Sequence, residues 1–310
     1  MTSTDHHRYL VVGATGEQGG AVARRLLSDG HHVRVLIRAG TDPVRLPAGV
    51  EPVIGDLADP TQMASAFAGV THASVMLPMV YEPTVVASYA EHLARAAAAA
   101  GVNRLVFNTG TGVPDVLTGV TAFETRRAAA ATLLGSGVPT VVLHPLVYRE
   151  NLCAPWVAGS TVHEGVLRYP LPADLPVAWL GHDDLAAATV AALTRDGVEG
   201  TTVRLGGPDV VTGTELAGQI GAALGRPVEY AELDVDDFER GLAYAVGADA
   251  AAGVAATYRW LATAEGARSC ARWAVAASSR HVEEALGVQL TPLRTWAGAQ
   301  PWHRIAQAAA

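Results

Sequence analysis

Three glycines at fixed spacing, Gly13, Gly16 and Gly19, follow a short apolar run near the start of the chain. The run, residues 9–12, is long enough for a buried strand, and residues 21–27 have the periodicity of a helix. In such a strand–turn–helix the first glycine allows a tight turn, the second lets backbone approach a pyrophosphate, and the third lets the helix pack closely on the strand. The phosphates then lie over free N–H groups at the positive end of the helix dipole. This segment therefore predicts a dinucleotide-binding site.

The residues around this loop also indicate which dinucleotide binds. Thr15 and Gln18 lie between the glycines and are the predicted phosphate or ribose contacts. A free ribose 2′-OH is usually met by an acidic residue after the second strand, and a 2′-phosphate by arginine. Here the second predicted strand, residues 32–38, ends at Arg38, and its immediate neighbours carry no acid. A planar, permanently charged guanidinium suits phosphate, so NADP is predicted over NAD, the alternative being a solvated arginine at a strand end.

Further candidate contacts stand at the carboxyl ends of the next strands, the edge at which ligands bind in such sheets. Asp56 follows the third predicted strand, where its carboxylate could accept a hydrogen bond from an adenine amino group; an ordinary turn would explain it equally well. The other predicted cofactor contacts at this edge are Leu57, Leu77, Pro78, Asn108, Pro145 and Tyr148.

The elements that would position these residues alternate between strand and helix. This alternation predicts a parallel sheet covered on both faces, and right-handed crossovers make it a doubly wound α/β fold. We predict that residues 8–150 form a Rossmann domain that binds NADP, with returning elements near 177–207. Residues 151–176 and 208–310 are broken by prolines and then rich in alanine, which predicts a smaller, mostly helical lobe that binds substrate.

The composition excludes several classes of protein. The chain has 310 residues, half of them hydrophobic, which suffices for a large core. The net charge of −8 argues against a general nucleic-acid-binding surface. The two cysteines, Cys153 and Cys270, lie far apart without metal-ligand spacing, so neither disulfides nor a metal site is predicted. Without a signal-like segment or an apolar run of ~18 residues, we expect a cytoplasmic protein that does not enter a membrane.

Several motifs in the same order resemble the NmrA-like family. They are GATGEQG at 13–19, Arg38, GDL at 55–57, SGVPT at 136–140, PLVYREN at 145–151, Asp184, LGGP at 205–208 and the segment 279–296. The family belongs to the atypical short-chain dehydrogenases/reductases. It contains NADP-dependent reductases and redox-sensing regulators that bind NADP without turning it over. The resemblance thus implies NADP(H) as the cofactor.

The helix after the fifth strand departs from the reductase pattern. Typical members carry a lysine there that holds the ribose, with a tyrosine four residues earlier; these positions fall on Arg126 and Ala122. Arg126 can bond ribose hydroxyls, but with a pKa above ~12 it cannot relay a proton. Tyr148, just past the sixth strand, is the predicted alternative proton donor, against a simple packing role. Arg126 and Tyr148 are therefore the catalytic candidates, and His163 and His182 are further titratable groups near the substrate loops.

We predict an NADP(H)-dependent oxidoreductase acting on a small, largely apolar carbonyl, enone-like or quinone-like compound. Met76, Met79, Trp156 and Trp179 are candidate walls of an apolar pocket, although core packing would also account for them. The incomplete reductase pattern keeps two alternatives open. One is a non-catalytic NADP sensor that acts on a protein partner, and the other is a redox-neutral tailoring enzyme. A homo-oligomer is compatible with the sequence.

Overall fold

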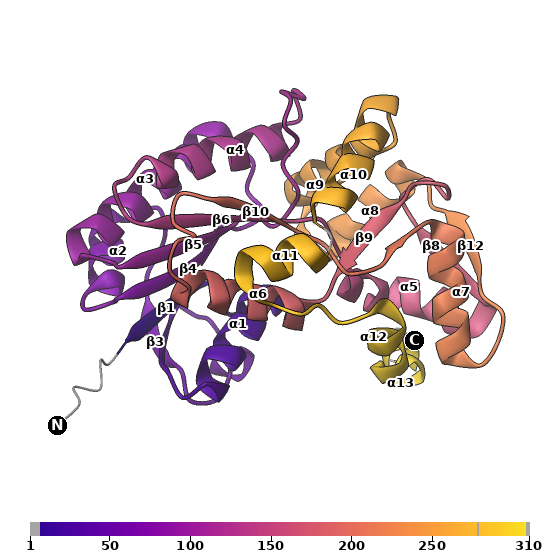
Figure 1. Ribbon diagram of the computed structural model, residues 1–310, viewed down its shortest axis with the longest axis horizontal. Helices are drawn as coiled ribbons and strands as arrows, with labels where there is room; N and C mark the ends of the chain where they lie inside the picture. The colour runs from indigo at the N-terminus through magenta and orange to yellow at the C-terminus, as the bar shows by residue number, and fades with distance from the viewer. Residues whose placement is uncertain (1–6, 278, 308–310) are drawn as a thin grey trace.

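The computed structural model describes residues 7–277 and 279–307 and is organised around one seven-stranded sheet (Figure 1). Its neighbouring strands pair in parallel, in the order β10-β6-β5-β4-β1-β2-β3. The strands are β1 (Arg8–Val12), β2 (His32–Ile37), β3 (Glu51–Ile54), β4 (His72–Met76), β5 (Arg104–Asn108), β6 (Thr140–Pro145) and β10 (Thr202–Leu205). The strand order reverses between β1 and β4, which is the switch point where such sheets bind ligands.

Helices cover both faces of this sheet, so the predicted doubly wound α/β fold is confirmed. One face packs against α1 (Glu17–Ser28), α6 (His182–Thr194) and α11 (Ser279–Leu286). The other packs against α2 (Pro60–Phe67), α3 (Pro83–Ala100) and α4 (Thr121–Leu134). Strands buried on both faces have continuous apolar sequence, as in β5, where Leu105, Val106 and Phe107 are fully buried.

Side chains decide where the helices on the second face begin. Asp59 accepts hydrogen bonds from the backbone N–H groups of Thr61 and Gln62 at the start of α2. Glu82 accepts one from Val85 at the start of α3. Each cap is followed by a proline, which suits the first helical position because it has no N–H to satisfy.

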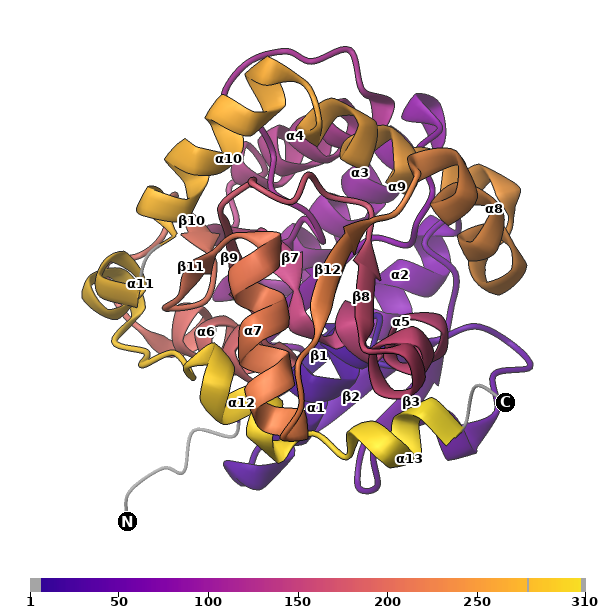
Figure 2. The same cartoon turned by 90° about the vertical axis from the view of Figure 1, so that its right-hand side faces the viewer.

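The C-terminal lobe is mostly helical, as predicted, and also contains two small sheets (Figure 2). One sheet joins β7 (Val147–Tyr148), β9 (Val177–Leu180) and β11 (Val210–Val211), and the other joins β8 (Val166–Tyr169) and β12 (Glu229–Glu232). The helices are the 3₁₀ helix η2 (Arg149–Cys153), α5 (Pro155–Gly159), the π-helix η3 (Ser160–Glu164), α7 (Gly213–Leu224), α8 (Val235–Val246), α9 (Ala248–Leu261), α10 (Ala264–Ala276), α12 (Leu293–Ala299) and α13 (Trp302–Gln307).

The segment near 177–207 divides between the two parts of the molecule. Strand β10 pairs with β6 at the edge of the main sheet, and α6 packs against α1 on its face. Strand β9 instead pairs with β7 and β11 in the lobe. The chain thus crosses into the lobe, returns to complete the Rossmann sheet, and leaves again. The exact limits of the two predicted domains stay a prediction.

Candidate functional site

One cavity of about 810 Å³ runs from the glycine loop into the C-terminal lobe. Residues at or just after the ends of four strands, Val12, Ile37, Met76 and Leu146, line it, as expected for a site at the carboxyl edge of a parallel sheet. We call the part lined by Gly13, residues 15–18 and 36–38, Thr41, Arg45 and residues 55–57 the glycine-loop half. The part lined by the rings of Trp156, Tyr169, Phe238, Tyr258 and Trp273 is the aromatic half.

The glycine loop has the geometry that a pyrophosphate requires. Gly13 adopts φ +91°, a left-handed conformation that favours glycine. A Cβ atom at Gly19 would lie 2.4 Å from the carbonyl oxygen of Gly13, so only glycine lets α1 approach the loop this closely. Gly16, the N-cap of α1, has no side chain with which to cap the first turn. The N–H groups of that turn can therefore bind an anion, and Gly13 and Gly16 line the cavity beside them.

Two exposed arginines lie at the rim of this half. Arg38 directly follows β2 and lines the cavity, as the sequence predicts for a 2′-phosphate contact. Arg45 lines it too, and its Nη2 lies 3.4 Å from the carbonyl oxygen of Thr15. Sequence reasoning missed Arg45. The available signal was Asp42-Pro43, because the Asp42 carboxylate caps the short 3₁₀ helix η1 (Pro43–Arg45) that returns Arg45 to the glycine loop.

Asp56 and Leu57 both line the glycine-loop half after β3. The Asp56 Oδ1 atom accepts a hydrogen bond from the N–H of Ala58 at 2.9 Å, and its own N–H donates to Gln62 Oε1 at 2.9 Å. The carbonyl oxygen of Leu57 accepts a hydrogen bond from His92 Nδ1 at 2.8 Å. The turn is therefore fixed by its own hydrogen bonds, with the exposed Asp56 carboxylate at the cavity wall.

Gln18 connects the glycine loop to the far side of the cavity. Its Oε1 accepts hydrogen bonds from Asn108 Nδ2 at 2.9 Å and from the Tyr148 hydroxyl at 2.8 Å. Burial raises the pKa of Tyr148, so this phenol keeps its proton, and the proton is directed at Gln18. Only the amide N–H₂ of Gln18 is then left for a phosphate or a ribose. Gln18 and Tyr148 line the cavity, whereas Asn108 lies behind Gln18 and does not.

Arg126 is buried and holds the loop that follows β4. Its guanidinium donates to the carbonyl oxygens of Pro78 at 2.6 Å and Val80 at 3.1 Å, and lies 5.1 Å from the centre of the Tyr81 ring. The same ring packs on α9, where a Cβ at Gly253 would lie 2.0 Å from it. Arg126 thereby links the two halves of the cavity and positions Leu77 and Pro78 in its wall. Its predicted catalytic role stays a prediction.

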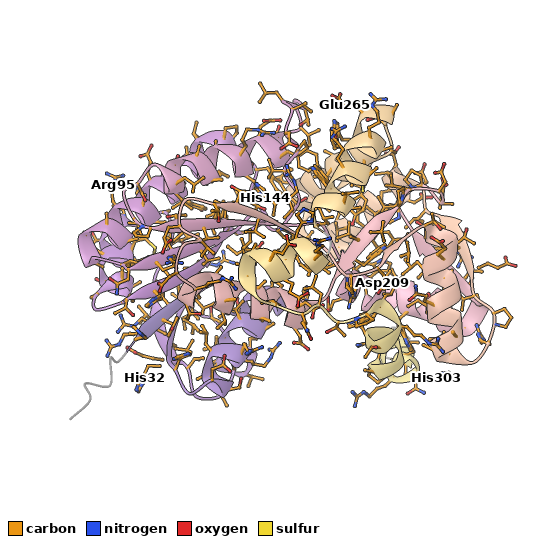
Figure 3. All side chains as sticks on the ribbon, viewed as in Figure 1. His32, Arg95, His144, Asp209, Glu265 and His303 are labelled. Atoms are coloured by element: carbon orange, nitrogen blue, oxygen red, sulfur yellow. The ribbon has the colours of Figure 1, made fainter. Side chains whose placement is uncertain are left out.

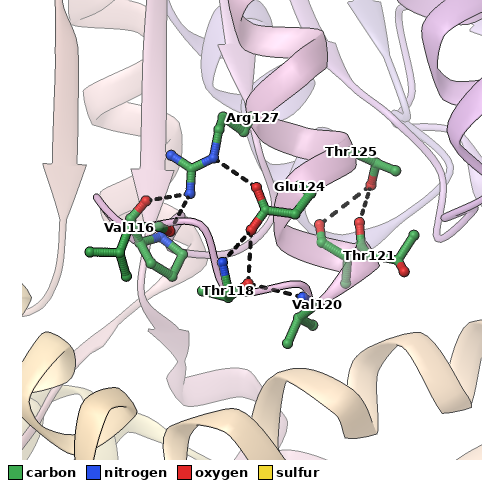
Figure 4. A network of polar contacts seen from close by, with 9 residues as sticks. Val116, Thr118, Val120, Thr121, Glu124, Thr125 and Arg127 are labelled. Carbon is green, nitrogen blue, oxygen red and sulfur yellow. Dashed lines mark hydrogen bonds and ion pairs between the residues drawn. The ribbon is translucent and has the colours of Figure 1, made fainter.

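The loop between β5 and α4 is tied to the start of α4 (Figure 4). The Glu124 carboxylate accepts hydrogen bonds from the N–H and hydroxyl of Thr118 at 2.8 and 2.9 Å, and from Arg127 Nε at 2.9 Å. Arg127 Nη2 in turn donates to the carbonyl oxygens of Pro114 and Val116. This network fixes the first turn of α4, and Ala122 in that turn lines the cavity at the position where the resemblance implies a tyrosine in typical reductases.

A second pair of polar groups faces the cavity beside Tyr148. The backbone N–H of His182 donates to Glu150 Oε1 at 2.9 Å, and the ring Nε2 atom of His182 lies 3.7 Å from Glu150 Oε2. Burial lowers the pKa of His182 to about 4 and raises that of Glu150, so desolvation favours the neutral form of each group. The Tyr148 and His182 rings meet edge to face with centroids 5.0 Å apart. Of the two histidines predicted as titratable groups near the substrate loops, His182 lines the cavity and the exposed His163 does not.

Some predicted residues lie outside the cavity wall. Gly19 supports the loop from behind. Pro145 is buried in β6 and is paired with Leu205 of β10, whereas the next residue, Leu146, lines the cavity. Trp179 is also buried in the core of the lobe, whereas Met76, Met79 and Trp156 line the cavity as expected. Within residues 7–277 and 279–307, no cluster of His, Cys, Asp and Glu side chains is arranged to hold a metal ion.

The parallel sheet, its switch point and the glycine loop define a dinucleotide-binding protein of the Rossmann class. The chain belongs to the NmrA-like family, whose model matches residues 5–297. The predicted family is thus confirmed. In the part of the chain that the structure describes, no helix is both long and apolar enough to cross a membrane.

Several similar proteins are reductases by name. The chain is 37% identical over 232 residues to the (4-alkanoyl-5-oxo-2,5-dihydrofuran-3-yl)methyl phosphate reductase of Streptomyces griseus subsp. griseus, covering 73% of this chain and 77% of that protein. It is 32% identical over 237 residues to the NAD(P)H azoreductase of Xenophilus azovorans, covering 75% and 79%. The fold matches triphenylmethane reductase of Citrobacter sp. in complex with NADP(H), with a TM-score of 0.72, 22% identity, and coverage of 97% and 100%. The family and the two sequence relatives support an oxidoreductase that binds a nicotinamide cofactor.

Proposed function

We propose that this protein is an NADP(H)-dependent reductase of small, largely apolar carbonyl, enone-like or quinone-like compounds. The observation that carries the proposal is the continuity of the cavity, because one space joins the glycine loop to the aromatic half. Such a space allows a dinucleotide and an apolar substrate to lie in contact. The names of the relatives from Streptomyces and Xenophilus, both reductases, support the same class of reaction.

The glycine-loop half fits NADP(H). The uncapped first turn of α1 would hold the pyrophosphate, Arg38 and Arg45 the 2′-phosphate, and Asp56 the adenine edge. When bound, the cofactor supplies a hydride from C4 of its nicotinamide. The chain's own contribution is orientation: Gln18 and Arg126 fix opposite walls of the space between the two halves.

We assign Tyr148 a positioning role, because its proton points at Gln18. Neutral His182 packs edge to face against it and keeps charge away from this part of the wall. The mouth of the cavity includes Met79 and Trp156, which are 48% and 49% exposed. In this proposal the product receives its proton from water that enters there.

The first test is calorimetric titration with NADP, NADPH, NAD and NADH. Arg38→Ala should weaken the binding of NADPH roughly 10- to 100-fold and leave NADH binding nearly unchanged, since only NADPH carries the 2′-phosphate. Arg95→Ala is the matched control, because Arg95 is exposed on α3 at the outer side of the molecule (Figure 3). An unchanged NADP preference in Arg38→Ala would remove the 2′-phosphate role.

The second test is turnover. The wild-type protein should oxidise NADPH with members of a panel of carbonyl, quinone and imine acceptors. Tight NADPH binding with no oxidation across the panel would overturn the reductase and favour a non-catalytic NADP-binding sensor. The alanine methyl group of Ala122 in the cavity wall is the observation that favours that second candidate. A sensor would bind the oxidised and reduced cofactors with different affinities and would co-purify with a protein partner.

A further inference from the structure

Three polar side chains lie together in the otherwise largely apolar aromatic half of the cavity. The hydroxyl oxygens of Tyr169 in β8 and Tyr258 in α9 are 2.6 Å apart. Asn151 in η2 donates from its Nδ2 atom to the Tyr169 hydroxyl at 3.0 Å. Both tyrosines are buried, at 2% and 7% exposure, and all three residues line the cavity. The cluster therefore joins three elements at the wall that a substrate would touch.

The cluster holds one more hydroxyl proton than its internal contacts use. Two phenols carry two O–H protons, and the single contact between Tyr169 and Tyr258 uses one of them. Asn151 approaches with an N–H group, so it adds a donor rather than an acceptor. Whichever phenol donates to the other, the second O–H proton has no acceptor in this cluster. A buried donor of this kind is costly unless a partner accepts its hydrogen bond.

The direction of the hydrogen bonds from Asn151 to Tyr169 to Tyr258 identifies which hydroxyl proton has no acceptor in the cluster. The Asn151 N–H polarises the Tyr169 hydroxyl, which then donates more strongly to the oxygen of Tyr258, because successive hydrogen bonds reinforce one another. Tyr258 accepts from Tyr169 and is left with its own O–H for the cavity. Burial raises the pKa of both phenols, that of Tyr258 to about 12, so each keeps its proton at neutral pH.

We infer that the Tyr258 hydroxyl is the binding site for a neutral oxygen acceptor of the ligand, namely the carbonyl or quinone oxygen of an otherwise apolar compound. The surrounding wall selects against an anionic ligand, because Phe238 and Trp273 offer no charge to pair with it. Arg168, a cation at the edge of this half, is already paired with Glu164 at 2.7 Å. That the ligand is a substrate rests on the proposed function.

The test compares two ligands of matched shape on the NADP-loaded protein. Duroquinone carries two carbonyl oxygens, and its ring is fully methylated, so it does not arylate cysteines. Durene has the same methylated ring without oxygens. Dissociation constants are measured by equilibrium dialysis, which suits poorly soluble compounds. We expect the wild type to bind duroquinone about ten-fold more tightly than durene, since only the quinone accepts the Tyr258 hydrogen bond.

Three phenylalanine variants locate the donor. Tyr258→Phe should abolish the roughly ten-fold preference for duroquinone and leave durene binding unchanged. Tyr169→Phe should lower the preference only about two- to three-fold, because Tyr258 keeps its proton and loses only the reinforcing neighbour. Tyr230→Phe is the control: this half-buried phenol donates at 2.7 Å to the carbonyl oxygen of Leu171 and at 3.2 Å to that of Tyr169, but it does not line the cavity.

A wild type that binds duroquinone no more tightly than durene overturns the inference, as does an unchanged preference in Tyr258→Phe. A larger loss in Tyr169→Phe than in Tyr258→Phe overturns the choice of Tyr258 as the donor. A different result would contradict the proposed function. If the preference depends on Tyr258 but the wild type never oxidises NADPH with duroquinone or the wider panel, the oxygen site stands and the reductase does not.

Discussion

The two halves of the cavity differ in what lines them, mainly backbone in one half and side chains in the other. The glycine-loop half is formed by the backbone of one continuous segment and two strand ends, and its side chains Arg38 and Arg45 are exposed. The aromatic half is formed by side chains from η2, α5, β8, α8, α9 and α10, which are far apart in the sequence. Backbone geometry suits a ligand part that never changes, such as a pyrophosphate. A wall of side chains can change its ligand by single substitutions.

A substitution at Gly19 should have the largest effect, and it should affect the glycine-loop half without affecting the aromatic half. In Gly19→Ala the new Cβ would meet the Gly13 carbonyl oxygen at 2.4 Å and its carbonyl carbon at 2.6 Å, so α1 must move away from the loop. We expect a loss of about 2–3 kcal/mol in the free energy of unfolding and no measurable NADPH binding. Duroquinone binding to the folded fraction should survive, because the aromatic half contains no part of this loop. Urea unfolding and dialysis measure the two effects.

Gly218→Ala provides the control for that substitution. Gly218 lies in α7, and an added Cβ there would meet no atom within 4 Å. Its stability should stay the same or rise slightly, because alanine favours the helix. Equal behaviour of the two alanine variants would contradict the close approach at Gly19.

Arg126 lies between the halves, and its removal should affect both. Arg126→Met removes the guanidinium donor from the carbonyl oxygen of Val80, leaves the carbonyl oxygen of Pro78 with the backbone N–H of Val80 at 2.7 Å, and removes the guanidinium from the Tyr81 ring. The expected loss is about 2 kcal/mol of unfolding free energy, with weaker binding of both NADPH and duroquinone. Arg126→Lys should recover part of it, since an ammonium reaches one carbonyl. A methionine variant that loses only one of the two ligands would show that the halves are uncoupled.

Acid should destabilise the sheet side of the molecule through its buried histidines. Burial lowers the pKa of His72, His144 and His182 to about 4, so the unfolded chain binds protons at these sites below pH 6.5 and the folded chain does not. Stability is therefore complete above pH 6.5 and falls as pH drops towards 4, by up to about 1.4 kcal/mol per pH unit for each histidine.

His144→Asn should reduce that slope between pH 6.5 and 5, as measured by urea unfolding at several pH values. His144 is buried at the end of β6, where its Nδ1 atom meets Thr109 Oγ1 at 3.0 Å (Figure 3). The control is His303→Asn, because His303 is exposed in α13. The same slope in wild type and His144→Asn would contradict the buried neutral state of His144.

Tyr148→Phe should have the smallest effect. The variant loses one hydrogen bond to Gln18, while Asn108 still holds the Gln18 amide. We expect kcat for NADPH oxidation to fall about three- to ten-fold, with KM little changed. A general acid would contribute about 10²–10⁴-fold, so a loss of that size would make Tyr148 the proton donor and end its positioning role.

The glycine-loop half was largely predictable because its information is local. The strand, the glycine spacing and the strand-end Arg38 follow one another along the chain, and the structure puts most of them on one cavity wall. Pro145 shows the limit of strand-end reasoning. The sixth strand runs two residues further than its apolar core, so the first residue there that lines the cavity is Leu146. A shift of one or two residues decides which side chain enters the site.

The aromatic half could not be predicted, because its contacts depend on long-range packing. Tyr169 and Tyr258 lie 89 positions apart and meet only when β8 and α9 close on each other. Arg126 was placed correctly on its helix, yet its guanidinium binds carbonyl groups 46 and 48 positions away. Hydrophobic periodicity identifies these segments as helix or strand but does not determine which of their side chains share a cavity.

Strand β10 has a consequence for how this chain is made. It forms the edge of the main sheet beside β6, and the whole of the chain between 146 and 201 is synthesised in between. When the first six strands have left the ribosome, the incomplete sheet therefore has an unpaired edge at β6. Such an edge is a site for misassociation. The main sheet gains its last strand, β10, only after residue 205 has emerged. The cavity-lining segments of η2, α5 and β8 are already outside by then, but α8, α9 and α10 follow β10, so the aromatic half is completed only after the main sheet.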